Sequence, residues 1–293
     1  MIKPQKVIDS HIHVFDLSRF RVLWLDNEPT LNCNNTLVEY SLASQVHPAE
    51  YTVAGVVHVE LDTTPEQKRA ENDYFAAEAT AGNTLIKAAV LHANMRDPDL
   101  RAFLEPYAQQ SGVKGVRHLL HVDNELSGAC LEPQFVESVR MLSELGLHFE
   151  GCLRSSDLSD FHALAQQCPQ TYFVLNHMGL PDVAAWQDPT RKAEVEQWNE
   201  DIRKLASLPN MCCKISGLGS ANPDIIRPLI DWCVAQFKPE RLIFASNFPV
   251  CNLQVTFDDW IRGVMACLQG LSQDDNDRIF YKNAMRIYGI EGV

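Results

Sequence analysis

The stretch Lys6-Val7-Ile8-Asp9-Ser10-His11-Ile12-His13 begins with apolar, β-branched residues and ends in two histidines that are two positions apart. Its apolar part predicts a buried β-strand near the start of the chain. Because residues two apart on a strand point to the same face, both imidazoles are expected to face one point. That point is expected at the carboxyl end of the strand, where α/β proteins place their chemistry. Two converging imidazoles predict half of a metal site or a pair of fixed hydrogen-bond groups.

The composition is that of a large, acidic, globular chain. The 293 residues are 46% hydrophobic, and 25 Lys and Arg against 38 Asp and Glu give a formal net charge of −13. An acidic surface repels phosphate backbones and anionic lipid, so neither nucleic acid nor a membrane surface is expected as a partner. The nine scattered cysteines include no Cys-x-x-Cys pair and indicate reduced thiols. Without a long apolar run or an apolar leader, the expected location is the cytoplasm.

Eight apolar runs alternate with segments of helical periodicity. The expected strands cover residues 7–11, 52–60, 85–92, 113–118, 147–152, 172–177, 211–215 and 241–246. The expected helices cover residues 65–81, 98–110, 131–145, 157–168, 191–206, 223–237, 257–268 and 273–288. This pattern predicts an α/β fold with a parallel sheet, and eight strands are the number that closes a (β/α)8 TIM barrel. A doubly wound open sheet is the alternative, but no glycine-rich turn follows the first strand.

Residues 14–50, roughly, are too many for a simple connection between the first two strands. We interpret them as a lid-like insertion over the barrel mouth, in which Trp24 either covers the substrate or belongs to the core. No internal repeat or low-complexity linker divides the chain. Residues 1–293 are therefore expected to form one barrel domain, and a homodimer is left open.

Polar side chains gather where the expected strands end. Eight of the ten histidines lie at such positions. Because a buried arginine is rare unless it faces an anion, Arg117 is expected to pair with a carboxylate of the substrate or of the protein. For His58, His92 and His148, a hydrogen-bonded place in the core is the ordinary alternative. The strand-end candidates are His11, His13, His58, Glu60, His92, Arg117, His118, His121, His148, Glu150, Cys152, His177, Lys214 and Asn247.

Five segments, in order along the chain, resemble the amidohydrolase superfamily, in the branch of sugar-lactone and muconolactone hydrolases. They cover residues 8–13, 115–118, 174–181, 213–218 and 241–250. The resemblance implies a barrel that hydrolyses a small lactone, sugar-derived or aromatic-catabolic, by attack of activated water on the ring carbonyl. It also implies one divalent metal, zinc or manganese, on His11, His13 and His177, with Arg117 and Lys214 binding the substrate.

The chain departs from this family at the eighth strand. The family usually has Ser-Asp-Trp-Pro there, with the Asp as metal ligand and general base, whereas this chain has Asn247 followed by Phe248. The Asp that usually precedes the sixth-strand histidine is also an amide, Asn176. An amide accepts no proton near neutral pH and carries no charge. Its presence weakens zinc retention and removes the obvious base.

Three mechanisms therefore remain open. In the first, a metal on the three histidines acidifies a bound water, and Glu150 or His118 takes the proton. In the second, no metal binds, the histidines and Arg117 polarise the lactone carbonyl, and another group activates the water. In either case Asn247 is expected to orient water or substrate by hydrogen bonds. In the third, the barrel binds a ligand and has lost catalysis. A metal-dependent decarboxylase of the same superfamily is the rival enzyme class.

Overall fold

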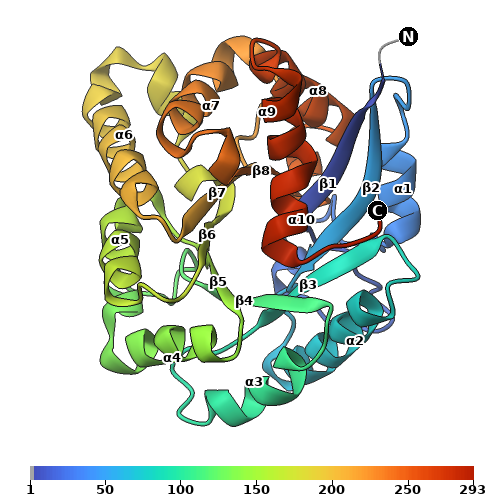
Figure 1. Cartoon of the computed structure of the whole chain (residues 1–293), viewed down its shortest axis with the longest axis vertical. Coiled ribbons are helices and arrows are strands. Elements are labelled where there is room, and N and C mark those ends of the chain that lie inside the picture. The colour runs from blue at the N-terminus through green and yellow to red at the C-terminus, as the bar shows by residue number, and fades with distance from the viewer. Residues whose placement is uncertain (1–2) are drawn as a thin grey trace.

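The computed structural model describes residues 3–293 and contains eight parallel strands, each paired with the next along the chain. β1 returns to β8 through a parallel bridge between Ile12 and Phe248, which brings the sheet round into a barrel (Figure 1). The expected (β/α)8 barrel is confirmed. The strands are β1 (Gln5–Ile12), β2 (Tyr51–Val59), β3 (Ile86–His92), β4 (Val113–Leu119), β5 (His148–Cys152), β6 (Phe173–Leu175), β7 (Met211–Ile215) and β8 (Leu242–Phe244).

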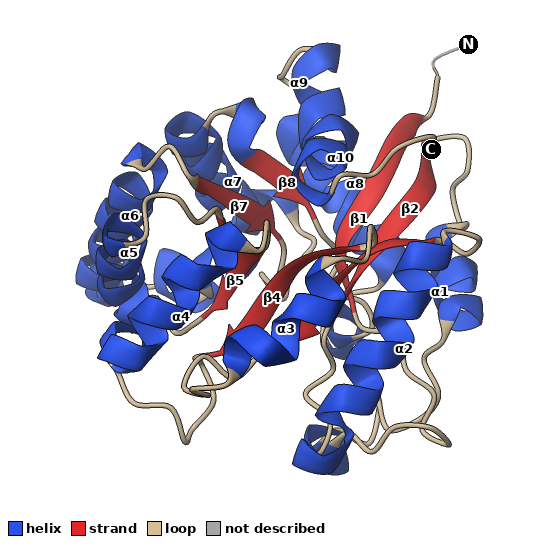
Figure 2. Cartoon of the chain, turned by 60° about the horizontal axis from the view of Figure 1, so that its bottom comes forward, coloured by secondary structure: helices blue, strands red, loops and turns tan. Residues whose placement is uncertain are grey.

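Helices surround the strands on the outside of the barrel (Figure 2). The expected helix over residues 273–288 is present as α9, a π-helical turn at Arg278–Lys282 and α10. The helices are α1 (Leu37–Ser44), α2 (Lys68–Ala81), α3 (Leu100–Ala108), α4 (Pro133–Glu144), α5 (Leu158–Gln167), α6 (Lys192–Ser207), α7 (Pro223–Phe237), α8 (Phe257–Leu268), α9 (Gln273–Asp277) and α10 (Asn283–Tyr288).

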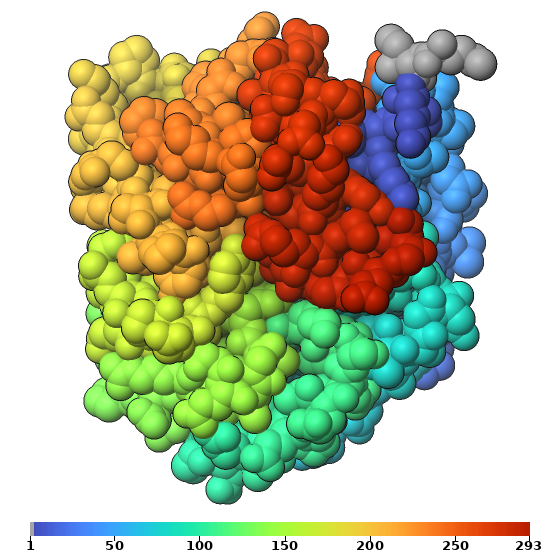
Figure 3. Space-filling model, in the orientation of Figure 1, coloured from blue at the N-terminus to red at the C-terminus, as the bar shows by residue number. Residues whose placement is uncertain are grey.

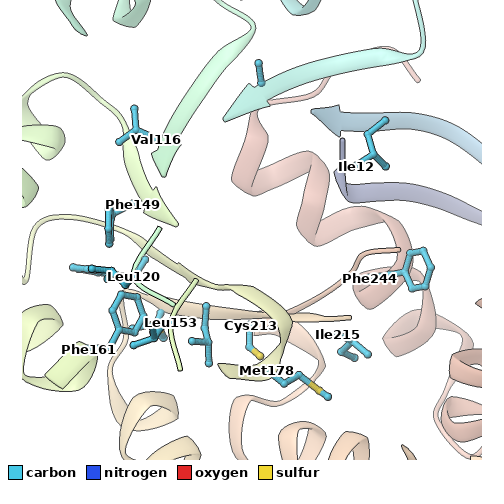
Figure 4. Packing of buried hydrophobic residues seen from close by; sticks show 14 of the residues in the cluster. Ile12, Val116, Leu120, Phe149, Leu153, Phe161, Met178, Cys213, Ile215 and Phe244 are labelled. Carbon is cyan, nitrogen blue, oxygen red and sulfur yellow. The ribbon is translucent and has the colours of Figure 1, made fainter. Parts of the chain in front are cut away.

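Alternation along the strands divides the apolar side chains into two layers. The outer layer lies between sheet and helices, where Phe149 of β5 contacts Phe161 of α5 (Figure 4). The inner layer fills the barrel and includes Val90, Val174 and Ile243. The barrel is therefore a packed core at this level and not a channel.

α10 closes the end of the barrel at which the strands begin. Ala284 and Tyr288 of this helix belong to the inner apolar layer. The Lys6 ammonium, at the start of β1, donates to the carbonyl oxygen of Val293, 2.6 Å away. In the space-filling view these C-terminal residues, in red, cover the centre of the face (Figure 3). A ligand site is accordingly expected at the opposite end.

A β-bulge in β1 decides which way its histidines point. Asp9 pairs with Val56 and Ile12 pairs with His58, so three steps along β1 match two steps along β2. The extra residue reverses the alternation. Ile8 packs in the inner layer while Ile12 packs in the outer one. His11, after the bulge, therefore points inward, although strict alternation from Ile8 would turn it outward.

The carboxyl ends of β6 and β8 turn more sharply than the sequence indicated. The expected strand over residues 172–177 ends at Leu175, and His177 and Met178 adopt left-handed backbone conformations with φ of 52° and 50°. β8 ends at Phe244, and Asn247 is also left-handed, with φ of 63°. Asn tolerates this conformation better than most residues. Both turns lift a polar side chain to the mouth of the barrel.

The connection between β1 and β2 holds a short 3-10 helix (Leu23–Asn27) and then α1. α1 contacts α8 on the outer wall of the barrel. Only the part around Trp24 reaches the mouth, so the prediction that the whole segment forms a lid remains a prediction. Within residues 3–293, no helix is both long and apolar enough to cross a membrane.

A buried ion pair lies above the apolar layer. Lys214 Nζ of β7 lies 2.5 Å from Glu150 Oε2 of β5, and both side chains are fully buried. The Tyr288 hydroxyl donates to Glu150 Oε1 at 2.6 Å, and Asn176 Nδ2 donates to Oε2 at 2.8 Å. Burial raises the pKa of Glu150, but the Lys214 ammonium outweighs it and holds the pKa well below its usual range. The carboxylate is therefore charged and saturated with donors.

His58 occupies an apolar place on the outer side of β2. Its ring stacks on Phe75 of α2, and neither ring nitrogen has a hydrogen-bond partner within residues 3–293. Burial holds the pKa of His58 well below its usual value. The ring is neutral in the folded protein, and the ordinary core interpretation of this histidine fits its position.

Replacing His58 with leucine is expected to raise the free energy of unfolding by about 1–3 kcal/mol at pH 7, because two buried nitrogens without partners disappear. His58 is protonated below about pH 6.5 only in the unfolded chain. The amount by which His58 lowers the free energy of unfolding therefore grows by about 1.4 kcal/mol per pH unit as the pH falls below that value. Urea denaturation at pH 7.5, 6.0 and 5.0 measures both effects. The matched change His162→Leu, at a less buried position on α5, should alter the pH dependence far less. Identical pH dependences in wild type and His58→Leu would contradict the assignment.

Breaking the Lys214–Glu150 pair from one side is expected to be costly. Lys214→Met leaves a buried carboxylate without a cation and should lower the free energy of unfolding by about 3–5 kcal/mol. The double variant Lys214→Met/Glu150→Gln removes both charges and should recover most of that loss. Urea denaturation of the wild type, both single variants and the double variant gives the free energies of a double-mutant cycle. A double variant no more stable than Lys214→Met would show that the two charges do not depend on each other.

Candidate active site at the carboxyl ends of the strands

A cavity of about 330 Å³ opens at the end of the barrel opposite α10. It is lined by residues that follow β1, β2, β4, β5, β6 and β8, which is where barrel enzymes of this architecture carry their active sites. Its polar lining includes His13, Arg117, His121, Cys152, His177 and Asn247. With Trp24, five of the residues that were assigned a role in the site from the sequence therefore share one cavity, and His121 and Cys152 join them.

The two histidines of β1 meet as the sequence predicted. His11 Nε2 and His13 Nε2 lie 3.0 Å apart, and the His177 ring centre is 4.6 Å from that of His11. His13 Nδ1 lies 2.9 Å from the Val59 carbonyl oxygen, which can only accept. Nδ1 therefore carries the proton and Nε2 is an acceptor. Burial and the Arg117 guanidinium lower the pKa of His13 to about 3, so the ring is neutral.

The Lys214 ammonium determines the tautomer of His11. Lys214 Nζ lies 3.3 Å from His11 Nδ1, and an ammonium can only donate. With the proton on Nε2, His11 accepts from Lys214 and donates to His13. With the proton on Nδ1 instead, His11 would place an N–H donor against the ammonium, which is also a donor. Its Nε2 lone pair would then face the lone pair of His13 Nε2. The first arrangement satisfies both contacts, and burial and Lys214 hold the pKa of His11 well below its usual value.

This hydrogen-bond pattern does not suit a divalent metal. A metal needs a free lone pair on each imidazole that binds it. Here His11 Nε2 carries a proton, and the lone pair of His13 Nε2 accepts the hydrogen bond from it. His177 Nδ1 is engaged by Ser216 Oγ at 2.7 Å. Across residues 3–293, no three His, Cys, Asp or Glu side chains are arranged to hold a metal. The three rings converge as predicted, but as arranged they do not form the donor set that the resemblance implied.

Arg117 is fixed by Glu60. The carboxylate expected from the sequence beside this arginine therefore comes from the protein and not from a substrate. Its Nε donates to Glu60 Oε1 at 2.9 Å and its Nη2 to the Glu60 carbonyl at 2.8 Å. Burial raises the pKa of Glu60, but Arg117 outweighs it and holds the pKa well below its usual range. The third nitrogen, Nη1, lies 3.4 Å from His11 Nε2. Because that atom carries a proton, Nη1 remains available to an acceptor in the cavity.

Glu150 and Lys214 do not reach the cavity, which corrects their predicted roles. Both side chains are fully buried and bonded to each other beneath it. Glu150, with its pKa held well below its usual range, cannot serve as the base, and Lys214 Nζ faces Glu150 and His11 instead of a substrate. Their function in the structure is to support the histidine pair from below.

His118 is also displaced from its predicted role. It follows Arg117 on β4, so it points to the opposite face of the strand. Its Nδ1 accepts from the Met95 amide at 3.2 Å, and its ring lies against Phe135 of α4. The ring therefore lies in the outer layer and takes no proton from a group in the cavity.

Cys152 and His121 form a part of the site that motif reasoning left unassigned. The Cys152 thiol lies beside the imidazoles of His121 and His177. Burial raises its pKa, yet the two imidazoles hold it well below the usual value of a thiol. Both residues were strand-end candidates in the sequence, and alternation is the signal that places them on the inward face. His121 follows Arg117 by four positions, and Cys152 follows Glu150 by two.

Asn247 and Trp24 line the cavity as predicted. The backbone N–H of Asn247 donates to the His11 carbonyl at 2.9 Å, which joins the segment after β8 to β1 and fixes the position of residue 247 at the mouth. Trp24 Nε1 donates to the Leu61 carbonyl at 2.9 Å, so the indole is held by the connection after β2. Both side chains are placed to contact a ligand.

Comparisons with known proteins agree with this architecture. The L-fucono-1,5-lactonase of Burkholderia multivorans is 28% identical over 268 residues, covering 86% of this chain and 85% of its own. The L-rhamnono-gamma-lactonase of Scheffersomyces stipitis is 27% identical over 340 residues, covering 97% and 99%. An amidohydrolase structure from Burkholderia multivorans with bound zinc superposes with a TM-score of 0.83 at 22% identity, covering 97% and 99%. The family model described as amidohydrolase matches residues 8–290, and the chain belongs to the amidohydrolase family.

Proposed function

We propose that this protein is a hydrolase that opens a small lactone ring, sugar-derived or aromatic-catabolic, to the corresponding hydroxy acid. The observation that carries the proposal is the Arg117 guanidinium, which is clamped by Glu60 and directs Nη1 toward a cavity lined by neutral imidazoles. Such a fixed cation stabilises the negative charge that develops on a carbonyl oxygen under attack. The names of the curated relatives, a fuconolactonase and a rhamnonolactonase, support a lactone as the substrate class.

In this reaction the lactone carbonyl oxygen lies against Arg117 Nη1. Attack on the carbonyl carbon gives a tetrahedral species, and its collapse breaks the bond to the ring oxygen. A neutral imidazole can take the proton of the attacking group and return it to the ring oxygen. His177 fits this role, because burial lowers its pKa and Ser216 orients its ring. Asn247 and Trp24 orient the ring of the substrate.

We further propose that catalysis proceeds without a resident metal. Zinc or manganese on His11, His13 and His177 would require His11 to release its Nε2 proton and Lys214 to lose its acceptor. A doubly charged ion would also stand beside Arg117 and Lys214, whose charges Glu60 and Glu150 already balance. Asp62 lines the cavity, but its carboxylate is already paired with Lys68 at 2.6 Å, and Asn247 occupies the place of the family's Asp.

Turnover of a lactone is the direct test. Purified protein is mixed with L-fucono-1,5-lactone, L-rhamnono-1,4-lactone and 2-pyrone-4,6-dicarboxylate, and acid release is followed with a pH indicator. At least one lactone should be hydrolysed, and treatment with a chelator should leave kcat unchanged. Elemental analysis of the same sample should find well under one equivalent of zinc or manganese. Loss of activity on chelation, restored by either ion, would contradict the metal-free proposal but would leave the proposed lactone hydrolysis intact.

Arg117→Lys keeps a positive charge but loses the fixed fork, and should lower kcat by about 100-fold or more. Arg101→Lys, an exposed change on α3, is the matched control and should have no effect. Carbon dioxide release from 5-carboxyvanillate, without turnover of any lactone, would replace this proposal with a decarboxylase. Failure to turn over either class would favour a barrel that only binds a ligand.

A further inference from the structure

We propose that Cys152 is the nucleophile of this reaction and that its thiol attacks the lactone carbonyl to form a thioester on the enzyme. The inference rests on the proposed lactone hydrolysis and goes beyond it, because it assigns a covalent step to a residue of the cavity wall. It also accounts for a chain in which the usual strand-eight carboxylate has become Asn247. Three observations carry it.

The first observation is the strand register, which places Cys152 between two histidines. Leu119 of β4 pairs with Cys152, and the Leu120 amide donates to the Cys152 carbonyl at 2.9 Å. On the other side, Gly151 pairs with Leu175 of β6. His121 and His177 each follow their paired strand by two residues, so they flank Cys152. All three residues line the same cavity.

The second observation is that Ser216 fixes the orientation of the His177 ring, which shares the cavity with Cys152. Ser216 Oγ lies 2.7 Å from His177 Nδ1, which leaves the Nε2 edge of the ring free of that contact. Gly217 supports the close approach, because a Cβ at this position would lie 2.7 Å from His177 Cβ. A nucleophile, a base beside it and a third group that orients the base form the arrangement that activates cysteine and serine nucleophiles.

The third observation concerns the other groups that were available for the chemistry. Glu150 and His118 lie outside the cavity, and Asn247 cannot accept a proton. Asp62 lines the cavity, but its carboxylate is held by the Lys68 ammonium at 2.6 Å. His121 Nδ1 is buried without a hydrogen-bond partner within residues 3–293. That imidazole is therefore free to receive a proton or to direct a water molecule beside the thiol.

The reaction balances without any further reactant. The Cys152 thiol gives its proton to His177, and a bond forms between Sγ and the carbonyl carbon. Arg117 Nη1 stabilises the oxyanion. The bond to the ring oxygen then breaks, and His177 returns the proton to that oxygen, leaving a thioester that carries the free hydroxyl group. Water attacks the thioester, its proton passes through His121 or His177 to the thiol, and the hydroxy acid leaves. No atom of the lactone is lost in the first half, so the enzyme gains the full mass of the substrate.

The test combines variants with a direct search for the thioester. Cys152→Ala and Cys152→Ser are compared with Cys251→Ser, a matched change of another cysteine near the mouth, for turnover of the lactone that the wild type hydrolyses best. Wild-type enzyme is also mixed with that lactone, quenched in acid within the first turnover and analysed by intact-protein and peptide mass spectrometry. Thermal melts of all variants establish that they are folded.

We expect both Cys152 variants to lose at least 100-fold in kcat while Cys251→Ser stays within about twofold of wild type. The peptide containing Cys152 should carry the mass of one lactone. Serine preserves the size of the side chain, so a thiol with only a packing role would tolerate it. Turnover within about threefold of wild type in either Cys152 variant would overturn the proposal and leave lactone hydrolysis intact. So would the absence of the adduct in quenched wild type. Absence of lactone turnover by the wild type would instead overturn the proposed function, and this inference with it. If a variant does not fold, the wild-type adduct decides.

Discussion

The buried contact between Lys214 and Glu150 is the interaction on which the site depends. It consists of one ammonium and one carboxylate, both fully buried, joined at 2.5 Å between the apolar core and the cavity. A buried pair of this kind persists only when its remaining donors and acceptors are satisfied. Tyr288 and Asn176 donate hydrogen bonds to the carboxylate, and His11 Nδ1 accepts a hydrogen bond from the ammonium. The ion pair therefore determines which nitrogen of His11 accepts and which donates a hydrogen bond.

That direction of hydrogen bonding differs from the one that a metal centre requires. In many metalloenzymes a ligating imidazole donates its second N–H to a carboxylate or carbonyl, which leaves the first nitrogen free for the metal. His13 has this arrangement with the Val59 carbonyl, but His11 has the reverse, because its second nitrogen faces an ammonium. The same His-x-His sequence can thus form half of a metal site or a hydrogen-bonded pair. The residue beneath it determines which of the two is formed.

Much of the fold was predictable because it follows from periodicity. Eight apolar runs separated by amphipathic segments specify a parallel barrel, and its strand ends specify which residues approach the mouth. Errors in assigning residues to the site arose where a shift of one position along a strand turns a side chain from the inner to the outer face. His118 was assigned to the site although it neighbours Arg117 on β4, and neighbours on a strand face opposite ways. The bulge after Asp9 has no sequence signature, yet it alone turns His11 inward.

Glu150 illustrates a different limit of sequence reasoning. It has the correct facing, but the distance of a side chain from the mouth depends on its depth along the barrel. Asn176 after β6, Lys214 of β7 and Tyr288 of α10 donate to its carboxylate and hold it below the cavity, and the last two are remote from it in sequence. Cys152, two residues further along the same strand and on the same face, lies one level higher and reaches the cavity. Depth therefore separates a structural carboxylate from a reactive thiol on one strand.

The exchange of a carboxylate for Asn247 is best understood as a change in the charge balance of the whole site. Arg117 is balanced by Glu60, Lys214 by Glu150 and Asp62 by Lys68, so the charged protein groups around the cavity are already paired. In a low-dielectric cavity an additional carboxylate without a metal would attract the Arg117 guanidinium and compete with a substrate oxyanion for it. An amide at that position leaves the guanidinium to the substrate. Once the carboxylate is absent, proton transfer falls to the neutral imidazoles, and the group they flank is the thiol of Cys152.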